Sequence, residues 1–288
     1  MVIIMIVITA ASGKLGTLVA DQLAAKGMAS TVRLAARSPE KLDAYKAKGF
    51  EVVAADYQDP ASLRAALEGA DTLLLISSMG PNEARIAHHH NAIAAAKAAG
   101  VTRIVYTSAA NPSNSSLFDW AKAHVATEAE LKSSGVPFTI LRDNSYFSNN
   151  DALFAAAKES GVLPFTGIEA KVAYIDHEDV ASAIVGALTG AGHENKTYEI
   201  SGTQAYSAVE LAAILSELTG KEIKALDVPP AAFADQFRAM GLPEFVVEGI
   251  TSFYAALGAG EYAATSGDVE LLAGRPSTTA LAYLAKFA

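Results

Sequence analysis

The sequence contains no cysteine among its 288 residues. Disulfide bonds and thiolate chemistry are therefore excluded, and any catalysis must rest on other groups. No apolar run approaches the length of a membrane helix, and the run near the N-terminus has no basic region before it, so we expect a strand there and no signal peptide. Basic residues are too few for a nucleic-acid partner, because 22 lysines and arginines stand against 31 acids. These absences predict an acidic, cytoplasmic protein without membrane or nucleic-acid partners.

Hydrophobic residues make up 51% of the chain, which is enough for a large core. In the first half, short apolar runs alternate with alanine-rich segments of helical period, and glycines close the helical segments. Strands are expected at Thr31–Ala36, Glu51–Ala54, Asp71–Ile76, Thr102–Thr107 and Phe138–Leu141. Helices are expected at Lys14–Gly27, Pro39–Gly49, Pro60–Glu68, Asn82–Gly100 and Asp119–Gly135. The alternation predicts an α/β fold, a Rossmann-type doubly wound parallel sheet.

Residues 2–16 form an apolar run, a turn of small residues and the start of an amphipathic segment. This pattern predicts a buried strand that leads into a helix N-terminus, where free backbone N–H groups and the helix dipole favour a phosphate. Gly13 and Gly16 fit the usual short-chain pattern T-G-x-x-G-x-x-G, and Ala10 stands where its first glycine is expected. An ordinary strand, turn and helix is the alternative. The residues expected to bind the cofactor here are Ala11, Ser12, Gly13, Lys14 and Leu15.

The end of the second predicted strand carries no acid before Glu40, although NAD-binding sites place an acid there for the ribose hydroxyls. Arg37 instead offers a planar set of donors to a phosphate. Ser38 and Pro39 are typical of an N-cap and a first helical residue, so we expect a second helix N-terminus beside the same anion. The pattern favours NADP(H), with a solvated surface arginine as the alternative.

Asp56 and Tyr57 follow the third predicted strand, from which a side chain can meet the adenine. The alternative for Asp56 is to cap the helix that begins after it. Beyond residue 142 the alternation weakens, with strand-like pieces at Val172–Ile175, Thr197–Ile200 and Glu222–Ala225 and a break at Pro229–Pro230. We therefore expect an NADP-binding Rossmann domain at 1–145. A smaller α/β substrate lobe is expected at 146–288, interleaved with the last strands of the sheet.

A series of short motifs resembles the NmrA-like atypical short-chain dehydrogenase/reductases over nearly the whole chain. The motifs are Thr9–Gly16, Arg37–Lys41, Ala55–Tyr57, Leu73–Ser78, Tyr106–Ser108, His124–Glu128, Leu141–Asn149 and His193–Tyr198. Their order and spacing are most similar to the bacterial NADPH:quinone oxidoreductases of the second type and to the triphenylmethane reductases. The resemblance implies a Rossmann domain, NADPH as cofactor and hydride delivery to a small, flat, electron-poor acceptor.

Ordinary short-chain dehydrogenases carry a Tyr-x-x-x-Lys pair for proton transfer. Counted back from Glu128 along the family pattern, the tyrosine position holds Trp120 and the lysine position holds His124. An indole N–H donates a hydrogen bond but does not ionise in water, so the usual proton relay is expected to be absent. Quinones and carbocationic dyes are then favoured, because their reduction yields a stabilised phenolate or a neutral product. The catalytic candidates are His124, Tyr146 and Ser108; for His124 the alternative is packing beside an acid.

The family pattern places further residues at the nicotinamide, after the fourth, fifth and sixth strands. These cofactor candidates are Ser77, Ser78, Met79, Thr107, Asn144 and Ser145, while Arg142 is expected to pair internally. An aromatic set is the candidate wall for a planar substrate, with a place in the core as the alternative. This set comprises Trp120, Tyr146, Phe147 and Tyr174.

Two further patterns are not interpreted as metal sites. Consecutive helical side chains at His88–His90 point about 100° apart and cannot converge on one ion. Asp176–Asp179 is expected to cap a helix that starts near Glu178.

The sequence therefore predicts an NADPH-dependent oxidoreductase that transfers hydride to a quinone or similar electron-poor aromatic. Two alternatives stay open. One is a non-catalytic NADP-binding redox sensor or regulator, and the other is a reductase of a specialised carbonyl, double bond or aryl ether. The expected partner is a small aromatic or quinone molecule; a homodimer is left open.

Overall fold

A computed structural model describes residues 4–288, so residues 2 and 3 of the predicted first strand lie outside the described part. The chain divides into two compact units. The first comprises the chain up to Ser108 together with Ala123–Arg142 and Val180–Tyr198. The second comprises Ala109–Lys122, Asp143–Asp179 and Glu199–Ala288. The chain thus passes between the units several times, and one passage, at residues 142 and 143, lies close to the division expected at 145.

The first unit is built on a seven-stranded sheet with the order β3-β2-β1-β4-β5-β6-β8. Its strands are β1 (Ile6–Ile8), β2 (Val32–Ala36), β3 (Glu51–Ala54), β4 (Thr72–Leu75), β5 (Arg103–Ala109), β6 (Phe138–Asp143) and β8 (Lys196–Ile200). Strand β1 pairs in parallel with both β2 and β4, and the order of the strands reverses there. This confirms the predicted doubly wound fold and places a ligand crevice at the carboxyl ends of these strands.

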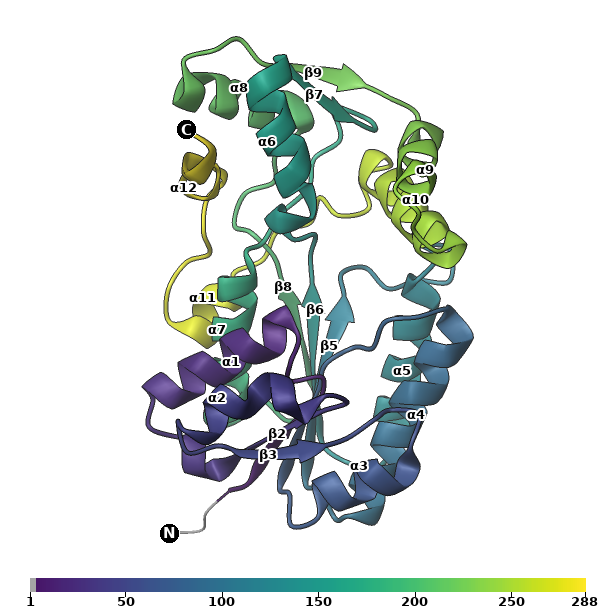
Figure 1. Ribbon diagram of the computed structural model, residues 1–288, viewed down its shortest axis with the longest axis vertical. Helices are drawn as coiled ribbons and strands as arrows, with labels where there is room; N and C mark the ends of the chain where they lie inside the picture. Colours follow the sequence, from purple (N-terminus) through teal and green to yellow (C-terminus); the bar gives the residue numbers. More distant parts are fainter. Residues whose placement is uncertain (1–3) are drawn as a thin grey trace. The chain divides into compact units, whose positions relative to one another are not determined.

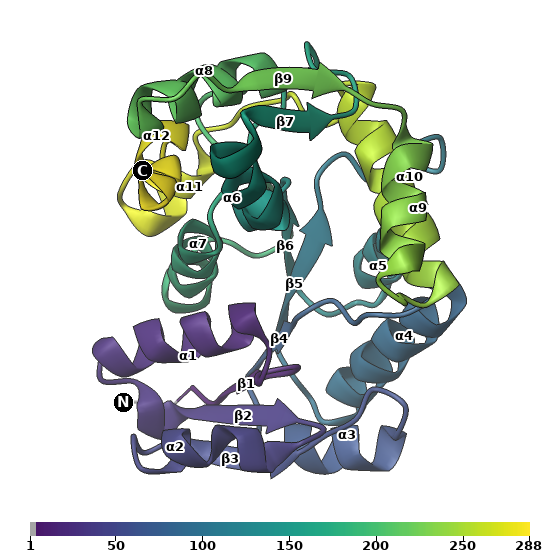
Figure 2. The same ribbon diagram turned by 45° about the horizontal axis from the view of Figure 1, so that its top comes forward.

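Helices cover both faces of this sheet, with α1 and α7 on one side and α3, α4 and α5 on the other (Figures 1 and 2). The helical segments are α1 (Lys14–Ala25), α2 (Asp43–Lys46), α3 (Pro60–Leu67), α4 (Asn82–Ala98), α5 (Ala121–Ser133) and α7 (His177–Thr189), with the 3₁₀ turns η1 (Ala29–Thr31) and η2 (Pro39–Leu42). The central strands β1 and β4 are buried at every residue. That explains their continuous apolar sequences, since helices on both faces leave no side of a parallel sheet in water.

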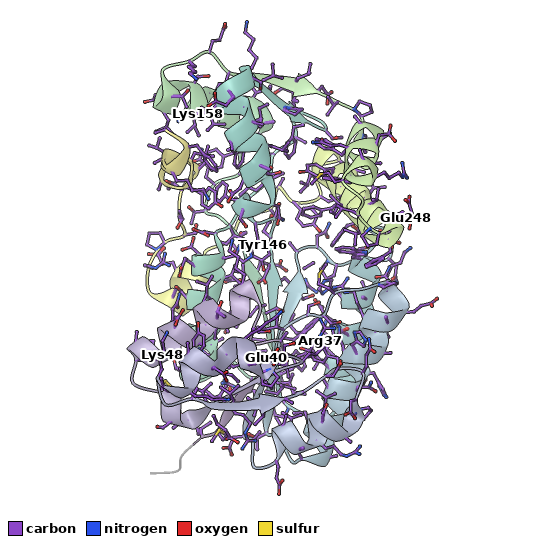
Figure 3. All side chains as sticks on the ribbon, viewed as in Figure 1. Arg37, Glu40, Lys48, Tyr146, Lys158 and Glu248 are labelled. Carbon is purple, nitrogen blue, oxygen red and sulfur yellow. The ribbon has the colours of Figure 1, made fainter. Side chains whose placement is uncertain are left out.

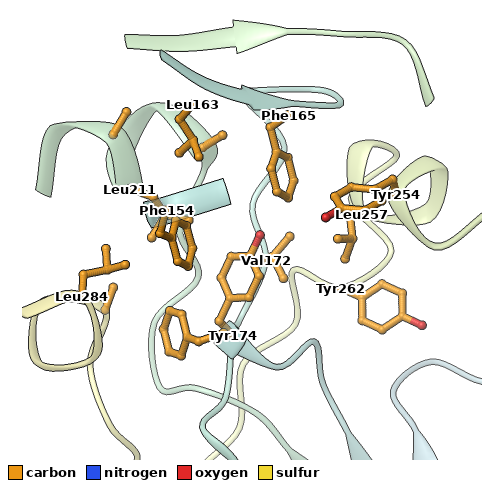
Figure 4. Packing of buried hydrophobic residues seen from close by; sticks show 14 of the residues in the cluster. Phe154, Leu163, Phe165, Val172, Tyr174, Leu211, Tyr254, Leu257, Tyr262 and Leu284 are labelled. Carbon is orange, nitrogen blue, oxygen red and sulfur yellow. The ribbon is translucent and has the colours of Figure 1, made fainter. Parts of the chain in front are cut away.

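The second unit combines helices with a two-stranded parallel sheet of β7 and β9. Its elements are η3 (Phe147–Asn150), α6 (Asp151–Ser160), β7 (Val162–Phe165), α8 (Ala208–Thr219), β9 (Lys224–Asp227), α9 (Pro230–Ala239), α10 (Glu244–Gly258), α11 (Asp268–Ala273), α12 (Ala280–Leu284) and η4 (Ala285–Phe287). Aromatic side chains fill its core (Figure 4). Phe165 meets Tyr254 edge to face at 5.5 Å between ring centroids, which adds directional packing to the burial of apolar area.

Two predicted elements differ from the structure, and one observed strand was not predicted. Val172–Ile175 is not a strand but makes two isolated bridges, because its apolar side chains are buried in the core of the second unit without a partner strand. Strand β7 was not predicted, since it contains Pro164, and a proline normally argues against a strand. The helix expected at Pro39–Gly49 is instead the 3₁₀ turn η2 followed by the four-residue helix α2. Within residues 4–288, no helix has both the length and the apolar character needed to cross a bilayer.

Candidate active site

The N-terminus of α1 has the features of an anion-binding site. Gly13 is its N-cap, no side chain caps it, and no acid occupies its first turn. The first N–H groups of a helix have no intrahelical partner, so the N–H groups that follow Gly13 are left for a ligand. The positive end of the helix dipole and the side chain of Lys14, the first helical residue, both favour negative charge there.

Close backbone approach makes Gly16 necessary in this turn. A Cβ added to Gly16 would lie 2.6 Å from the carbonyl oxygen of Ala11, which leaves no room for any side chain. Ala11 itself is fully buried, and its N–H donates to Ala35 O at 3.1 Å, which ties the turn to β2. Leu15 is also buried, whereas Gly13 and Lys14 are exposed. The predicted glycine turn is therefore present, although the Ala11 N–H is already used within the protein.

Arg37 follows β2 and is exposed (Figure 3). Within residues 4–288 it forms no ion pair or hydrogen bond, unlike Arg33 on the same strand, which binds Glu51 at 2.8 Å. The prediction for Ser38 was wrong in one respect, because its side chain makes no capping hydrogen bond. The 3₁₀ turn after it is short and its hydrogen bonds are less well aligned than those of an α-helix. Arg37 is thus the main candidate for a phosphate contact at the end of β2.

Tyr57 joins the ends of two strands. Its hydroxyl lies 2.7 Å from Oγ1 of Thr9 after β1 and 2.6 Å from the carbonyl oxygen of Ile76 after β4. Asp56 accepts the N–H of Gln58 at 2.9 Å, while Asp59 caps α3. The capping alternative considered for Asp56 therefore belongs to Asp59. Asp56 stays a candidate for the adenine.

The loop after β4 is fixed by buried groups of α4. Arg85 donates through Nε to Ser78 O at 2.9 Å and through Nη2 to Ser77 Oγ at 2.9 Å. The Ser77 N–H donates to Oγ1 of Thr107 on β5 at 3.0 Å. Met79, the next residue of the loop, is 70% exposed. Hydrogen bonds thus link Ser77, Ser78 and Thr107, whereas the side chain of Met79 is exposed.

Two buried histidines complete this network. His89 Nε2 accepts the Ser78 N–H at 2.9 Å, so its Nδ1 carries the proton and donates to Thr127 Oγ1 at 2.8 Å. Burial lowers the pKa of His89 to about 3, helped by the charge of Arg85. Imidazole protonation is therefore suppressed next to a buried guanidinium.

His124 lies on α5 with both ring nitrogens engaged. A guanidinium only donates, so Nε2 accepts from Arg85 at 2.9 Å, and Nδ1–H donates to the hydroxyl of Tyr106 at 2.8 Å. Burial, followed by the charge of Arg85, holds the pKa of His124 well below its usual value. The only ring proton of the neutral imidazole is committed to Tyr106. The catalytic role of His124 stays a prediction, and the geometry is that of a positioning residue.

Ser108 at the end of β5 donates to a buried carboxylate. Its Oγ lies 2.9 Å from Oε1 of Glu128, which also receives two hydrogen bonds from Arg142 at 2.9 and 2.8 Å. Burial raises the pKa of Glu128, but the hydrogen bonds from Arg142, Ser108 and Lys132 outweigh it, so the pKa is lowered. The internal pairing predicted for Arg142 is confirmed. The catalytic role of Ser108 stays a prediction, because its hydroxyl proton is directed to Glu128.

In the second unit, Asp143 and Tyr146 form a pair at the end of β6. Asp143 is 7% exposed, and its Oδ2 accepts from the hydroxyl of Tyr146 at 2.8 Å. The ring of Tyr146 (Figure 3) stacks on His177 with 3.9 Å between centroids. Asn144 follows Asp143; its Oδ1 accepts the Ser145 N–H and its Nδ2 donates to Tyr262 O. Ser145 Oγ is buried without a partner in the described chain.

The aromatic residues predicted to line a substrate slot occupy different environments. Phe147 and Tyr174 are 0% and 2% exposed and stack at 5.1 Å in the core of the second unit. Trp120 is half-buried and lies flat against Gly249 of α10, where an added Cβ would come within 2.2 Å of the indole. Tyr146 is also half-buried. A substrate contact by Phe147 or Tyr174 stays a prediction that their burial does not favour.

Comparison with known proteins bears on the cofactor site. A family model described as NAD(P)H-binding matches residues 10–191, more than half of the chain. This chain belongs to the NAD(P)H-binding family. Quinone oxidoreductase 2 of Escherichia coli (strain K12) is 37% identical to this family member over 275 residues, 96% of each protein.

Solved structures agree with this assignment. The NADPH-dependent quinone oxidoreductase of Escherichia coli, complexed with NADPH, matches with a TM-score of 0.92 at 36% identity, over 98% of this chain and 99% of that one. Citrobacter sp. triphenylmethane reductase, complexed with NADP(H), matches with a TM-score of 0.89 at 33% identity over the same shares. The resemblance predicted from the sequence motifs is confirmed, as is a nicotinamide dinucleotide cofactor.

The residues of this NAD(P)H-binding protein fit such a cofactor. The uncapped start of α1 suits the pyrophosphate, the missing Cβ of Gly13 lets the backbone come close to it, and the missing Cβ of Gly16 lets the helix pack against the turn. Arg37 suits a further phosphate. The sequence analysis did not identify Arg85, Glu128 or Asp143 as functional. Charged residues mostly lie on protein surfaces, so the sequence gives no signal that these three are buried.

Proposed function

We propose that this protein is an NADPH-dependent oxidoreductase that transfers hydride to a quinone or a similar electron-poor aromatic. The observation that carries the proposal is the uncapped N-terminus of α1 together with an unpaired Arg37, at the positions where a dinucleotide and its 2′-phosphate would bind. The names of the two reductases whose structures are compared above support the acceptor class.

In this proposal the bound cofactor supplies hydride, and the protein binds and orients. The N–H groups that follow Gly13 would hold the pyrophosphate, Arg37 the 2′-phosphate and Asp56 the adenine. The loop Ser77–Met79 and Thr107 would border the nicotinamide. Hydrogen bonds from Arg85 and to His89 hold this loop in place. In the second unit, Asn144 and Ser145 stay predictions as cofactor contacts. Preorganised contacts of this kind lower the barrier by orientation.

An acceptor that forms a stabilised anion suits these residues. Trp120 cannot act as an acid, and the single ring proton of His124 is held by Tyr106. A ketone would require prompt protonation of an alkoxide, whereas a quinone gives a phenolate and a triarylmethyl cation gives a neutral product. The cytoplasmic location and a homodimer stay predictions.

The test is oxidation of NADPH by the purified protein with 1,4-benzoquinone, 1,4-naphthoquinone and a cationic triarylmethane dye. We expect saturable turnover with at least one quinone, with NADPH used in preference to NADH. If NADPH binds but turnover stays at background with every acceptor, the catalytic proposal fails. The protein would then be an NADP-binding sensor, which needs no reaction.

A further inference from the structure

Two buried polar atoms belong to residues that lie two positions apart in the sequence, just before Tyr146. Within residues 4–288, neither Oδ1 of Asp143 nor Oγ of Ser145 has a hydrogen-bond partner. Asp143 is 7% exposed and Ser145 is 2% exposed. Buried polar atoms are almost always paired, so such atoms call for a functional explanation or a ligand.

The surroundings of Asp143 keep its carboxyl group protonated. Burial raises its pKa to about 8, and the hydrogen bond from Tyr146 lowers it by less. Tyr146 is a titratable group that contacts this carboxyl, and the ring of His177 stacks on Tyr146. Arg142, the preceding residue, turns its guanidinium to Glu128 instead. A carboxyl group in such surroundings is a neutral acid near pH 7.

Tyr146 is fixed for proton transfer. Its ring is held against His177, whose Nδ1 lies 3.1 Å from Ser148 Oγ, and its hydroxyl oxygen lies 2.8 Å from Asp143 Oδ2. When Asp143 is ionised its Oδ2 accepts from Tyr146, whereas a protonated Asp143 donates from Oδ2 to this oxygen. The phenolic O–H of Tyr146 is then released to donate to a ligand, because a hydroxyl both donates and accepts.

We propose that Asp143 supplies, through Tyr146, the proton that a reduced quinone takes up. This inference rests on the proposed function. Hydride from NADPH converts the quinone to a hydroquinone monoanion and leaves NADP⁺. Protonation accompanies the hydride transfer, because the oxygen that gains negative charge forms an O–H bond with the proton of Tyr146, whose own O–H bond breaks. The Asp143 proton moves from Oδ2 to the Tyr146 oxygen, and the remaining carboxylate is reprotonated by water.

In this scheme Tyr146 is the catalytic residue and Asp143 is a positioning residue that acts through it. The pair replaces the acid that Trp120 cannot supply. Ser145 Oγ is the second buried atom without a partner in the described part of the chain.

The test uses two acceptors that differ in their need for a proton. A quinone needs one, whereas a triarylmethyl cation becomes neutral on accepting hydride alone. Single-turnover rates are measured for both acceptors with the unaltered protein, Asp143→Asn, Tyr146→Phe and the control Glu169→Gln, an exposed carboxylate of the same unit. Affinity for NADPH is measured separately for each variant.

We expect Asp143→Asn and Tyr146→Phe to slow quinone reduction by roughly 100-fold, a typical contribution of general acid catalysis. Dye reduction and NADPH affinity should change less than twofold, and Glu169→Gln should alter neither acceptor's rate. In the unaltered protein, the rate with quinone should fall as the pH rises past about 8, and this fall should vanish in Asp143→Asn. Deuterated water should slow the quinone reaction and not the dye reaction.

Other outcomes would count against either the proton relay or the proposed function. Equal slowing of both acceptors, or unchanged quinone reduction in Asp143→Asn, overturns the proton relay and leaves the proposed function standing. If Asp143→Asn does not fold, Tyr146→Phe carries the same comparison. If the dye is not reduced, the pH dependence and the solvent isotope effect decide. If the unaltered protein reduces neither acceptor, the proposed function itself fails.

Discussion

Ala10 holds a backbone conformation that glycine adopts without strain. Its φ is +51°, in the left-handed region, at the turn where the family pattern has glycine. This region costs an L-residue about 1–2 kcal/mol, and the greater flexibility of an unfolded glycine returns about 0.4–1 kcal/mol of that. We therefore expect Ala10→Gly to raise the free energy of unfolding by roughly 0.5–1 kcal/mol in urea titrations.

The matched control for that substitution is the neighbouring Ala11→Gly. Ala11 is fully buried and its φ is not in the left-handed region, so glycine there removes packing and adds unfolded-state entropy. This variant should be less stable than the unaltered protein. Equal shifts in both variants would show that strain at residue 10 has no measurable cost.

Arg37 is the residue expected to distinguish NADPH from NADH. It is exposed and unpaired in the described chain, so its guanidinium is available to a phosphate. A hydrogen bond to a charged group contributes about 1.5–3 kcal/mol, so Arg37→Ala should weaken NADPH binding roughly 10- to 100-fold. Fluorescence titration should show less than a twofold change for NADH. The control is Arg64→Ala, an exposed arginine of the same unit; equal weakening of both cofactors would remove Arg37 from the phosphate site.

At the scale of elements, Glu128 connects α5 to the ends of β5 and β6. It binds Ser108 and Arg142 and is itself 3% exposed. Its pKa is lower in the folded than in the unfolded protein, so its contribution to stability is present above the unfolded pKa of about 4.3 and is lost as the pH falls through the folded value. Glu128→Gln should cost roughly 1–3 kcal/mol at pH 7.

Urea unfolding at pH 7 and near pH 3 checks this prediction. The difference between Glu128→Gln and the unaltered protein should shrink at the lower pH, because the carboxylate is then becoming protonated. Glu130→Gln on the same helix is the control, since its partner His90 is exposed and such pairs contribute little. A pH-independent difference would contradict the role assigned to the ionised carboxylate.

Elements were predictable from the sequence where local signals agreed. The helix that starts at Lys14 and strand β3 follow from period and flanking residues, and both were expected close to their observed bounds. The strand expected at Val172–Ile175 failed because an apolar run buried in a core looks the same with or without a partner strand. Strand β7 was missed because Pro164 is tolerated there, in a sheet of only two strands.

At the scale of the whole molecule, the alternation of strands and helices was enough to predict the fold class, and the turn around Gly13 is the predicted pyrophosphate site. The side-chain networks could not be predicted. Arg85 meets His124 across 39 positions of sequence, and Ser108 meets Glu128 across 20. No spacing rule links such residues. Sequence reasoning therefore named His124 and Ser108 as candidates without showing that their polar atoms are already engaged.

Calorimetric titration of the purified protein with NADPH tests the central claim most directly. The proposed hydride transfer and proton relay both require a dinucleotide bound at the start of α1 and at Arg37. We predict saturable heat of binding with one site per chain and a dissociation constant in the micromolar range, with NADH at least tenfold weaker. Absence of any binding heat at millimolar NADPH would contradict the cofactor site and the function built on it.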